Sequence, residues 1–193
     1  MKFLIGAGRL CLDLTRTVRR RGSEASEGLD GAAALVRWCR AAGVGVRLVS
    51  SDVTVAQVNV ARELREAIYN AVEARVLGKT PRKCDITLLN HCAGAPEPVP
   101  HLNRAGDAIA WKAESALNAV LSLVARDAID LLGSSSIRRV RECADENCTS
   151  LFLDTSRPGL RRWCSAMPCA NRHKVRAHRA RTKTKTSAAK RLV

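Results

Sequence analysis

Cys143-Ala-Asp-Glu-Asn-Cys148 and Cys164-Ser-Ala-Met-Pro-Cys169 decide the fold of the C-terminal part of this 193-residue chain. Each pair of cysteines encloses four residues, and fifteen residues separate the two pairs. Paired thiolates at such spacing are typical of a structural zinc site, in which four ligands surround the ion as a tetrahedron. Because four thiolates leave no position for water, the sequence predicts one structural Zn²⁺ and no catalytic metal.

The residues around the cysteines predict the shape of this module. Thr149–Asp154 is expected to be a strand, Thr155–Gly159 a turn and Leu160–Trp163 the return strand. Cys169 is expected to open a helix that runs to about Arg181. The module at 138–181 has few apolar side chains, so zinc is expected to supply its stability, on the order of 10 kcal/mol. We therefore expect removal of zinc to unfold this module alone.

The N-terminal body, residues 1–133, is predicted to be mainly α with small β elements. Helical periodicity, capping residues and glycine stops place its helices at residues 31–42, 54–77, 81–93 and 113–132. Two short strands, 99–102 and 108–111, flank a hairpin turn. A short flexible link near 133–136 is expected to join this body to the zinc-bound β-hairpin plus helix, a treble-clef-like module. Residues 182–193 are expected to form a basic disordered tail.

The remaining cysteines carry a different expectation. Cys11, Cys39, Cys84 and Cys92 are scattered through apolar or amphipathic stretches, so we expect core or surface thiols without a role in metal binding. Eight cysteines in this length are too few for a disulfide scaffold. The chain has no apolar run long enough for a membrane span and no signal-peptide core near its start. We therefore expect a cytoplasmic protein with no membrane partner.

Positive charge is concentrated in the zinc module. The formal net charge is +15, and the last 33 residues contain 11 lysines and arginines with no acidic residue. Such a segment favours a polyanionic partner, and a basic helix fits the major groove of double-stranded DNA. Only 3% of the residues are aromatic, which argues against a single-strand binder. The residues expected to contact nucleic acid are Arg161, Arg162, Arg172, Lys174, Arg176, Arg179 and Arg181, with Arg172 and Arg176 expected to read guanine edges.

No catalytic constellation is apparent in the body. It has no glycine-rich phosphate loop, no histidine pair at metal spacing and no defensible Ser/His/Asp set. We therefore expect a regulator and not an enzyme. The alternative is an RNA-binding or ribosome-associated zinc module, in which charge acts without sequence-specific DNA readout.

Two families resemble this chain. The segments Arg161-Arg162-Trp163-Cys164 and Cys169-Ala170-Asn171-Arg172, with Val140–Arg157 upstream, resemble the CGNR zinc finger. The stretches Gly8-Arg9-Leu10-Cys11-Leu12-Asp13-Leu14 and Ala61-Arg62-x-Leu64-Arg65-Glu66-Ala67 resemble the ABATE domain, its usual partner. The resemblance implies a bacterial transcriptional regulator, with a ligand-sensing body joined to a DNA-binding finger. It implies zinc ligation by Cys143, Cys148, Cys164 and Cys169 and a small-molecule effector of unknown site. Because a single finger offers a limited interface, typically about 600–1,000 Å², we also expect a homodimer formed through the body.

The chain departs from the family patterns at two positions. Ala170 replaces the motif glycine, which costs roughly 1 kcal/mol if the backbone there needs positive φ and nothing if it lies in the first helical turn. Arg16 stands where the body motif usually has asparagine. This second departure bears on any ligand contact at that position.

Overall fold

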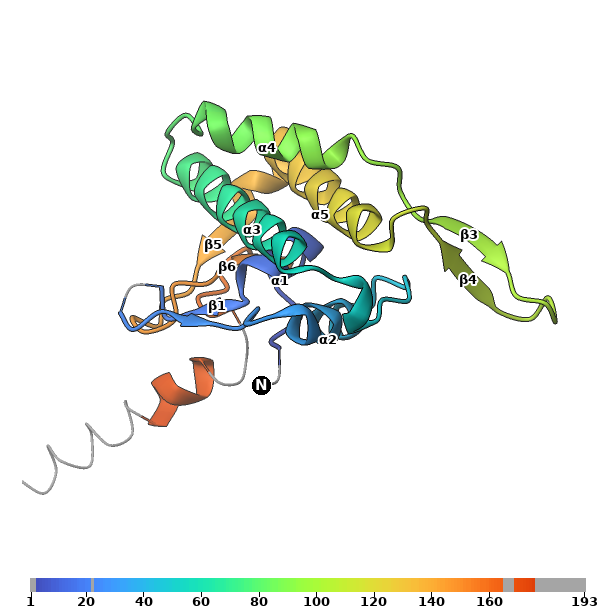
Figure 1. The fold of residues 1–193 in the computed structure, drawn as a ribbon. Coiled ribbons are helices and arrows are strands. Elements are labelled where there is room, and N and C mark those ends of the chain that lie inside the picture. The colour runs from blue at the N-terminus through green and yellow to red at the C-terminus, as the bar shows by residue number, and fades with distance from the viewer. Residues whose placement is uncertain (1–2, 22, 165–168, 176–193) are drawn as a thin grey trace, which may run out of the picture.

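The computed structural model describes residues 3–21, 23–164 and 169–175, and its largest feature is a group of packed helices (Figure 1). The long helices are α3 (Val55–Val76), α4 (Lys83–Ala93) and α5 (Ala116–Gly133). These three helices pack against one another, and the short α1 (Leu10–Thr15) packs against both α3 and α5. The described residues also form α2 (Ala32–Ala42) and three small pairs of strands. The fold is thus mainly α with small β elements, as the sequence predicted.

Helix α3 shows how local signals set these elements. Its capping box is formed as predicted: Gln57 donates its backbone N–H to Thr54 Oγ1 at 3.2 Å, and Thr54 donates its backbone N–H to Gln57 Oε1 at 2.9 Å. Leu64, Ile68 and Val72 recur at helical spacing and are fully buried. The first turn is therefore fixed by two reciprocal hydrogen bonds and the rest of the helix by its apolar face.

The other helix ends agree with the sequence in part. Helix α2 ends as predicted, with Gly43 in the left-handed region at φ 70°. Helix α4 begins at Lys83, two residues later than Pro81, because Arg82 is extended and its Nε donates to Asp85 Oδ2 at 2.8 Å across the first turn. Helix α5 begins at Ala116.

The described residues contain three two-stranded antiparallel sheets. They pair β1 (Val18–Arg19) with β2 (Ser26–Glu27), β3 (Val99–Leu102) with β4 (Ile109–Lys112), and β5 (Val140–Glu142) with β6 (Leu151–Leu153). The β3–β4 hairpin confirms the sequence prediction and projects away from the helices (Figure 1). All eight residues of its strands are exposed.

The sequence prediction for the hairpin of the zinc module is wrong about which strand pairs with β6. β6 pairs with β5, which precedes it, and residues 160–163 form no strand. The turn between β5 and β6 contains Cys143 and Cys148, and Cys143 donates its backbone N–H to the Ser150 carbonyl at 2.9 Å. The chain after β6 is instead held by Asp154, whose carboxylate accepts backbone N–H bonds from Ser156 and Arg161, both at 2.9 Å. Hydrogen bonds to the buried Asp154 carboxylate therefore hold this segment in place, where the sequence predicted the backbone hydrogen bonds of a return strand.

The link between body and zinc module is also more ordered than predicted. Helix α5 runs to Gly133, and the 3₁₀ helix η2 (Ser135–Arg139) follows directly with Ile137 buried. The zinc module shares one hydrophobic core with the body through side chains such as Phe152. Leu153 donates its backbone N–H to the Ala7 carbonyl at 2.7 Å, which joins β6 to the N-terminal segment. The module therefore docks on the body and does not hang from a flexible linker.

Residues 169–175 are helical, as the sequence predicts for the segment from Cys169 onward. The continuation of that helix to Arg181 and the tail at 182–193 lie outside the described residues. Within the described ranges, no helix is both long enough and apolar enough to cross a membrane.

Candidate zinc centre and its surroundings

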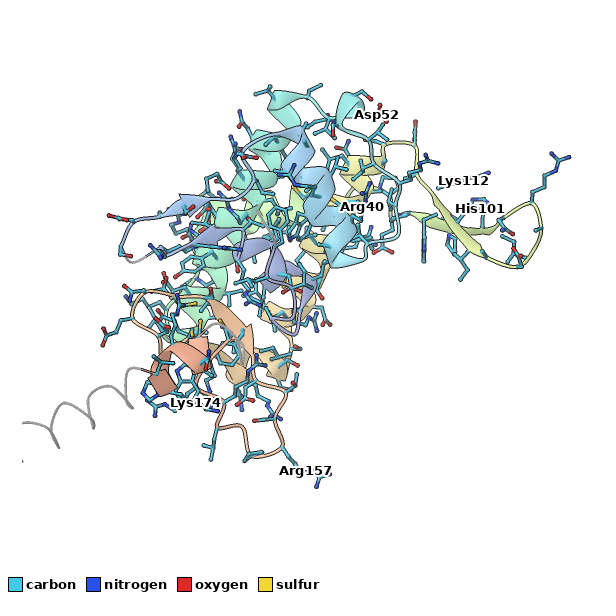
Figure 2. All side chains as sticks on the ribbon, turned by 90° about the horizontal axis from the view of Figure 1, so that it is seen from below. Arg40, Asp52, His101, Lys112, Arg157 and Lys174 are labelled. Carbon is cyan, nitrogen blue, oxygen red and sulfur yellow. The ribbon has the colours of Figure 1, made fainter. Side chains whose placement is uncertain are left out.

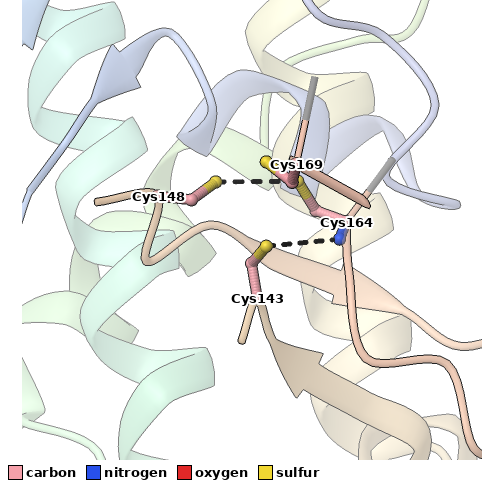
Figure 3. A group of neighbouring side chains, drawn as sticks. All are labelled: Cys143, Cys148, Cys164 and Cys169. Carbon is pink, nitrogen blue, oxygen red and sulfur yellow. Dashed lines mark hydrogen bonds between the residues drawn. The ribbon is translucent and has the colours of Figure 1, made fainter. Parts of the chain in front are cut away.

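The four cysteines of the two pairs meet at one point (Figure 3). Their sulfur atoms all lie within 4.8 Å of one another, with 3.6 Å between the sulfurs of Cys148 and Cys164 and 3.7 Å between those of Cys164 and Cys169. A zinc ion with Zn–S bonds of about 2.3 Å in a tetrahedron requires sulfur–sulfur distances of about 3.8 Å. A disulfide would require about 2.05 Å, and none of the four described cysteines is in a disulfide. The donor set and its spacing fit one structural zinc ion.

Each ligand is placed by a different local structure. Cys143 directly follows β5, Cys148 ends the turn before β6, Cys164 follows the loop held by Asp154, and Cys169 lies in the helical segment 169–175. Hydrogen bonds from the thiols of Cys143 and Cys164 lower the pKa of the Cys148 thiol, against the opposing effect of burial. The Cys148 sulfur is therefore prepared for the thiolate form that zinc requires.

Two arginines contact the sulfurs from outside the predicted tetrahedron. Arg172 Nη2 donates to Cys169 Sγ at 3.3 Å, and its Nε lies 3.0 Å from Asp145 Oδ2. Arg16, which comes from the body, donates from Nη2 to Cys164 Sγ at 3.7 Å. Such donors offset the negative charge of a four-thiolate zinc centre and orient its ligands. The sequence marked Arg16 only as a departure from a family pattern and did not connect it with zinc.

The predicted nucleic-acid contacts divide into internal and external groups. Arg161 donates to the carbonyls of Trp163 and Cys164, and its guanidinium lies 4.7 Å from the centroid of the Phe152 ring. Arg161 and Arg172 are thus engaged in the internal structure of the finger. Arg162 and Lys174 are exposed. Arg176, Arg179 and Arg181 lie outside the described residues.

The zinc module carries further exposed cations. They belong to the excess of basic residues after position 137, although none was predicted as a nucleic-acid contact: Arg138, Arg139, Arg141 and Arg157. Figure 2 shows Arg157 and Lys174 at the end of the molecule formed by the zinc module, far from His101 and Lys112 on the β3–β4 hairpin. Arg157 and Lys174 therefore lie at the end of the molecule opposite the hairpin.

The scattered cysteines differ from the zinc ligands. Burial raises the pKa of Cys11, and it raises that of Cys39 to about 12 and that of Cys92 by a smaller amount. These three thiols are protonated at neutral pH, while Cys84 is exposed on α4. Among the described residues, the four clustered cysteines form the one group of three or more side chains placed to share a metal ion.

Ala170 fits its position without strain. In the described part of the chain, the non-glycine residues with positive φ are Arg20 and Thr149. Ala170 lies in the first turn of the helix at 169–175, where a methyl group is tolerated. Replacement of the motif glycine therefore costs the finger nothing at this position.

A helical body whose core continues into a four-cysteine zinc site defines a zinc-finger protein with an integrated N-terminal domain. Comparison with family models gives the same architecture: the ABATE model, described as "putative stress-induced transcription regulator", matches residues 8–135, and the CGNR zinc finger model matches residues 139–182. The chain belongs to the ABATE family and carries a C-terminal CGNR zinc finger. No curated protein matches the sequence.

Proposed function

We propose that this chain is a DNA-binding transcription regulator, and not an enzyme, and that its CGNR finger contacts duplex DNA. The observation that carries the proposal is the exposed cationic surface of the finger, which includes Arg157, Arg162 and Lys174 and leads into a basic segment without acidic residues. Phosphate contacts from such residues supply most of the affinity of a DNA-binding module. The regulator description of the ABATE family supports the same function.

Different arginines have different roles in this proposal. Arg161 and Arg172 hold the finger together, so Arg162 and Lys174 are the described residues that would contact phosphates. Arg176, Arg179 and Arg181 follow in sequence and would read or contact the major groove. Zinc has a structural role, because it would fix the loop and helix that present these side chains.

The test is selection of bound duplexes from a random DNA pool by the zinc-loaded protein at physiological salt, followed by measurement of affinity. Replacing Arg162 and Lys174 by alanine is expected to weaken binding and to reduce the magnitude of the salt slope by about one for each lost phosphate contact. The matched control replaces Arg37 and Arg40, two exposed arginines of α2. Equal losses in both double variants would contradict the proposal. Tighter binding to RNA than to DNA duplexes at the same salt would favour the RNA-binding alternative.

We also propose that the β3–β4 hairpin joins two copies of the chain. Residues paired across an antiparallel ladder share a face, and the pairs Pro100–Trp111 and Leu102–Ile109 give one apolar face. Leu102 and Ile109 are 71% and 65% exposed. A second copy would cover this face and double the DNA contact, because one small module buries only about 600–1,000 Å².

Sedimentation of the L102S/I109T variant tests the dimer. It is expected to give a monomer, while Val55→Ser, at an equally exposed apolar position on α3, is expected to leave the dimer intact. A wild-type protein that stays monomeric at micromolar concentration, with and without DNA, would remove the dimer from the proposal. The protein would act in the cytoplasm, where reduced thiols remain free to bind zinc.

A further inference from the structure

A cavity of about 130 Å³ lies where the body meets the zinc finger. The body lines it with Arg16, which follows α1, and with Arg19 and Arg20 at β1. The finger adds Asn147, Ser150 and Arg172, together with two of the zinc-ligand cysteines. Among the described residues, four arginines and no carboxylate therefore line a small cavity between two parts of the chain.

Arg16 is the first sign that this cavity has a ligand. Its side chain is 1% exposed, and its Nε and Nη1 have no hydrogen-bond partner among the described residues. The nearest carboxylate oxygen, Asp13 Oδ1, is 3.8 Å from Nη1, and it already accepts the backbone N–H groups of Gly6 and Ala7 at 2.8 Å each. A buried cation with unused donors is costly unless another group accepts from them.

Arg20 is the second, independent sign. Its backbone lies in the left-handed region at φ 55°, which side chains other than glycine, asparagine and aspartate adopt at a cost. No hydrogen bond or ion pair is made by its guanidinium within the described part of the chain. Strained residues of this kind are concentrated where a ligand is held. Arg20 is exposed to solvent, so it adds to the lining of the cavity a positive charge that is reachable from outside.

The sulfur atoms of the zinc centre do not accept from every N–H donor that lines the cavity. Arg172 is already paired with Asp145 and with the Cys169 sulfur. Arg16 donates from Nη2 to the Cys164 sulfur, and its Nε and Nη1 have no hydrogen-bond partner among the described residues. The donors that remain for a ligand are therefore those of Arg16 and Arg20.

We propose that this cavity binds a small oxyanion, either a carboxylate or a phosphate, between the body and the zinc finger. Guanidinium groups match both through paired N–H donors. Since a water molecule occupies about 30 Å³ in the liquid, the cavity holds about four waters, the size of inorganic phosphate or a short carboxylate. A DNA phosphate does not fit this role, because the side chain of Arg16 is too deeply buried for a duplex to reach.

The bound anion would regulate the finger. Residues of both the body and the finger line the cavity, so the binding free energy of the anion would add to the stability of the docked arrangement. This regulatory meaning rests on the proposed DNA-binding function, whereas the anion site itself does not.

Calorimetry on the zinc-loaded full chain tests the site, with inorganic phosphate in one arm and succinate in the other, in chloride buffer at constant ionic strength. We expect saturable binding in at least one arm. Arg20→Asn keeps a residue that tolerates the left-handed region but removes the charge, and it is expected to weaken binding about tenfold or more. The matched control, Arg104→Asn in the exposed turn of the β3–β4 hairpin, is expected to bind as the wild type does.

Two results would overturn the anion site: no saturable heat with either anion, or equal affinities for the Arg20→Asn and Arg104→Asn variants. DNA affinity is measured separately on the same samples. Loss of DNA binding with anion binding intact would count against the proposed function alone. Intact DNA binding without anion binding would count against the cavity alone.

Discussion

Arg16 joins the two parts of the chain through one buried guanidinium beside the Cys164 sulfur. If it supports the zinc centre, Arg16→Gln will speed transfer of zinc to a chromogenic chelator, by about tenfold or more, as is typical when a residue supporting a metal ligand is lost. Arg16→Lys keeps the charge, so its rate of zinc transfer is expected to lie between the rates of the wild type and of Arg16→Gln. Arg37→Gln, at an exposed position on α2, serves as the control.

Zinc release at the wild-type rate from the Arg16→Gln variant would show that the contact at 3.7 Å has no effect on the metal. A variant that simply fails to fold would be recognised by its lost helical signal. The Arg16→Lys protein then still gives a rate to compare.

Cysteine reactivity gives a second prediction for single residues. In the zinc-loaded protein Cys84 is expected to react first with a thiol reagent, because it is exposed while Cys11, Cys39 and Cys92 are buried as protonated thiols. Four more thiols are expected to react once zinc is removed. Mass spectrometry of the labelled peptides identifies them, and early labelling of Cys143 or Cys164 with zinc present would contradict the four-thiolate site.

At the residue scale, spacing was enough to predict the zinc ligands, because each pair and its loop are local. Arg16 could not be assigned in this way. Its partner sulfur lies 148 residues further along the chain, and a single arginine in an apolar stretch does not indicate what it contacts.

Among the elements, α3 offers a direct test of a predicted cap. Thr54→Ala removes the hydroxyl that accepts the Gln57 N–H and is expected to lower the free energy of unfolding by about 1 kcal/mol in urea titrations. Thr54→Ser keeps the acceptor and is expected to stay near the wild-type value. Equal losses in both variants would mean that the methyl group, and not the hydrogen bond, matters.

Whether an element is predicted correctly depends on how close in sequence the residues that determine it lie. The start of α3, the glycine that ends α2 and the β3–β4 hairpin were all predicted from residues within or next to the element. The partner of β6 was not, because short segments of mixed apolar and charged residues, 140–142 and 160–163, lie on both sides of it in the sequence, and the pairing is with the earlier one. The loop after β6 depends on Asp154, whose pKa is lowered to about 2 by hydrogen bonds with Ser156 and Arg161, so it is charged at every physiological pH.

For the whole molecule, removal of zinc is expected to affect the body as well as the finger. The shared core and the Leu153–Ala7 hydrogen bond connect the finger to the N-terminal segment and α1. Hydrogen exchange after chelation is therefore expected to rise in α1 more than in α4, which packs on α3 and α5. This differs from the selective unfolding expected from the sequence, which treated the two parts as separate.

If hydrogen exchange rises only within residues 138–175, the finger unfolds independently of the body, as the sequence predicts. The sequence could divide the chain by charge and by cysteine spacing. It could not show that apolar side chains such as Phe152 complete the core of the body, since the pattern of one segment does not name the segment it packs on.

The hydrogen bond between Leu153 and Ala7 also has a consequence for how the protein is made. The ribosome releases the N-terminal segment long before it synthesises the strand that this segment must join. At about 5–20 residues per second, the delay is on the order of ten seconds. During that interval the apolar residues of α1 lack their finger contacts, so the newborn chain is expected to need chaperone protection until its last cysteine emerges.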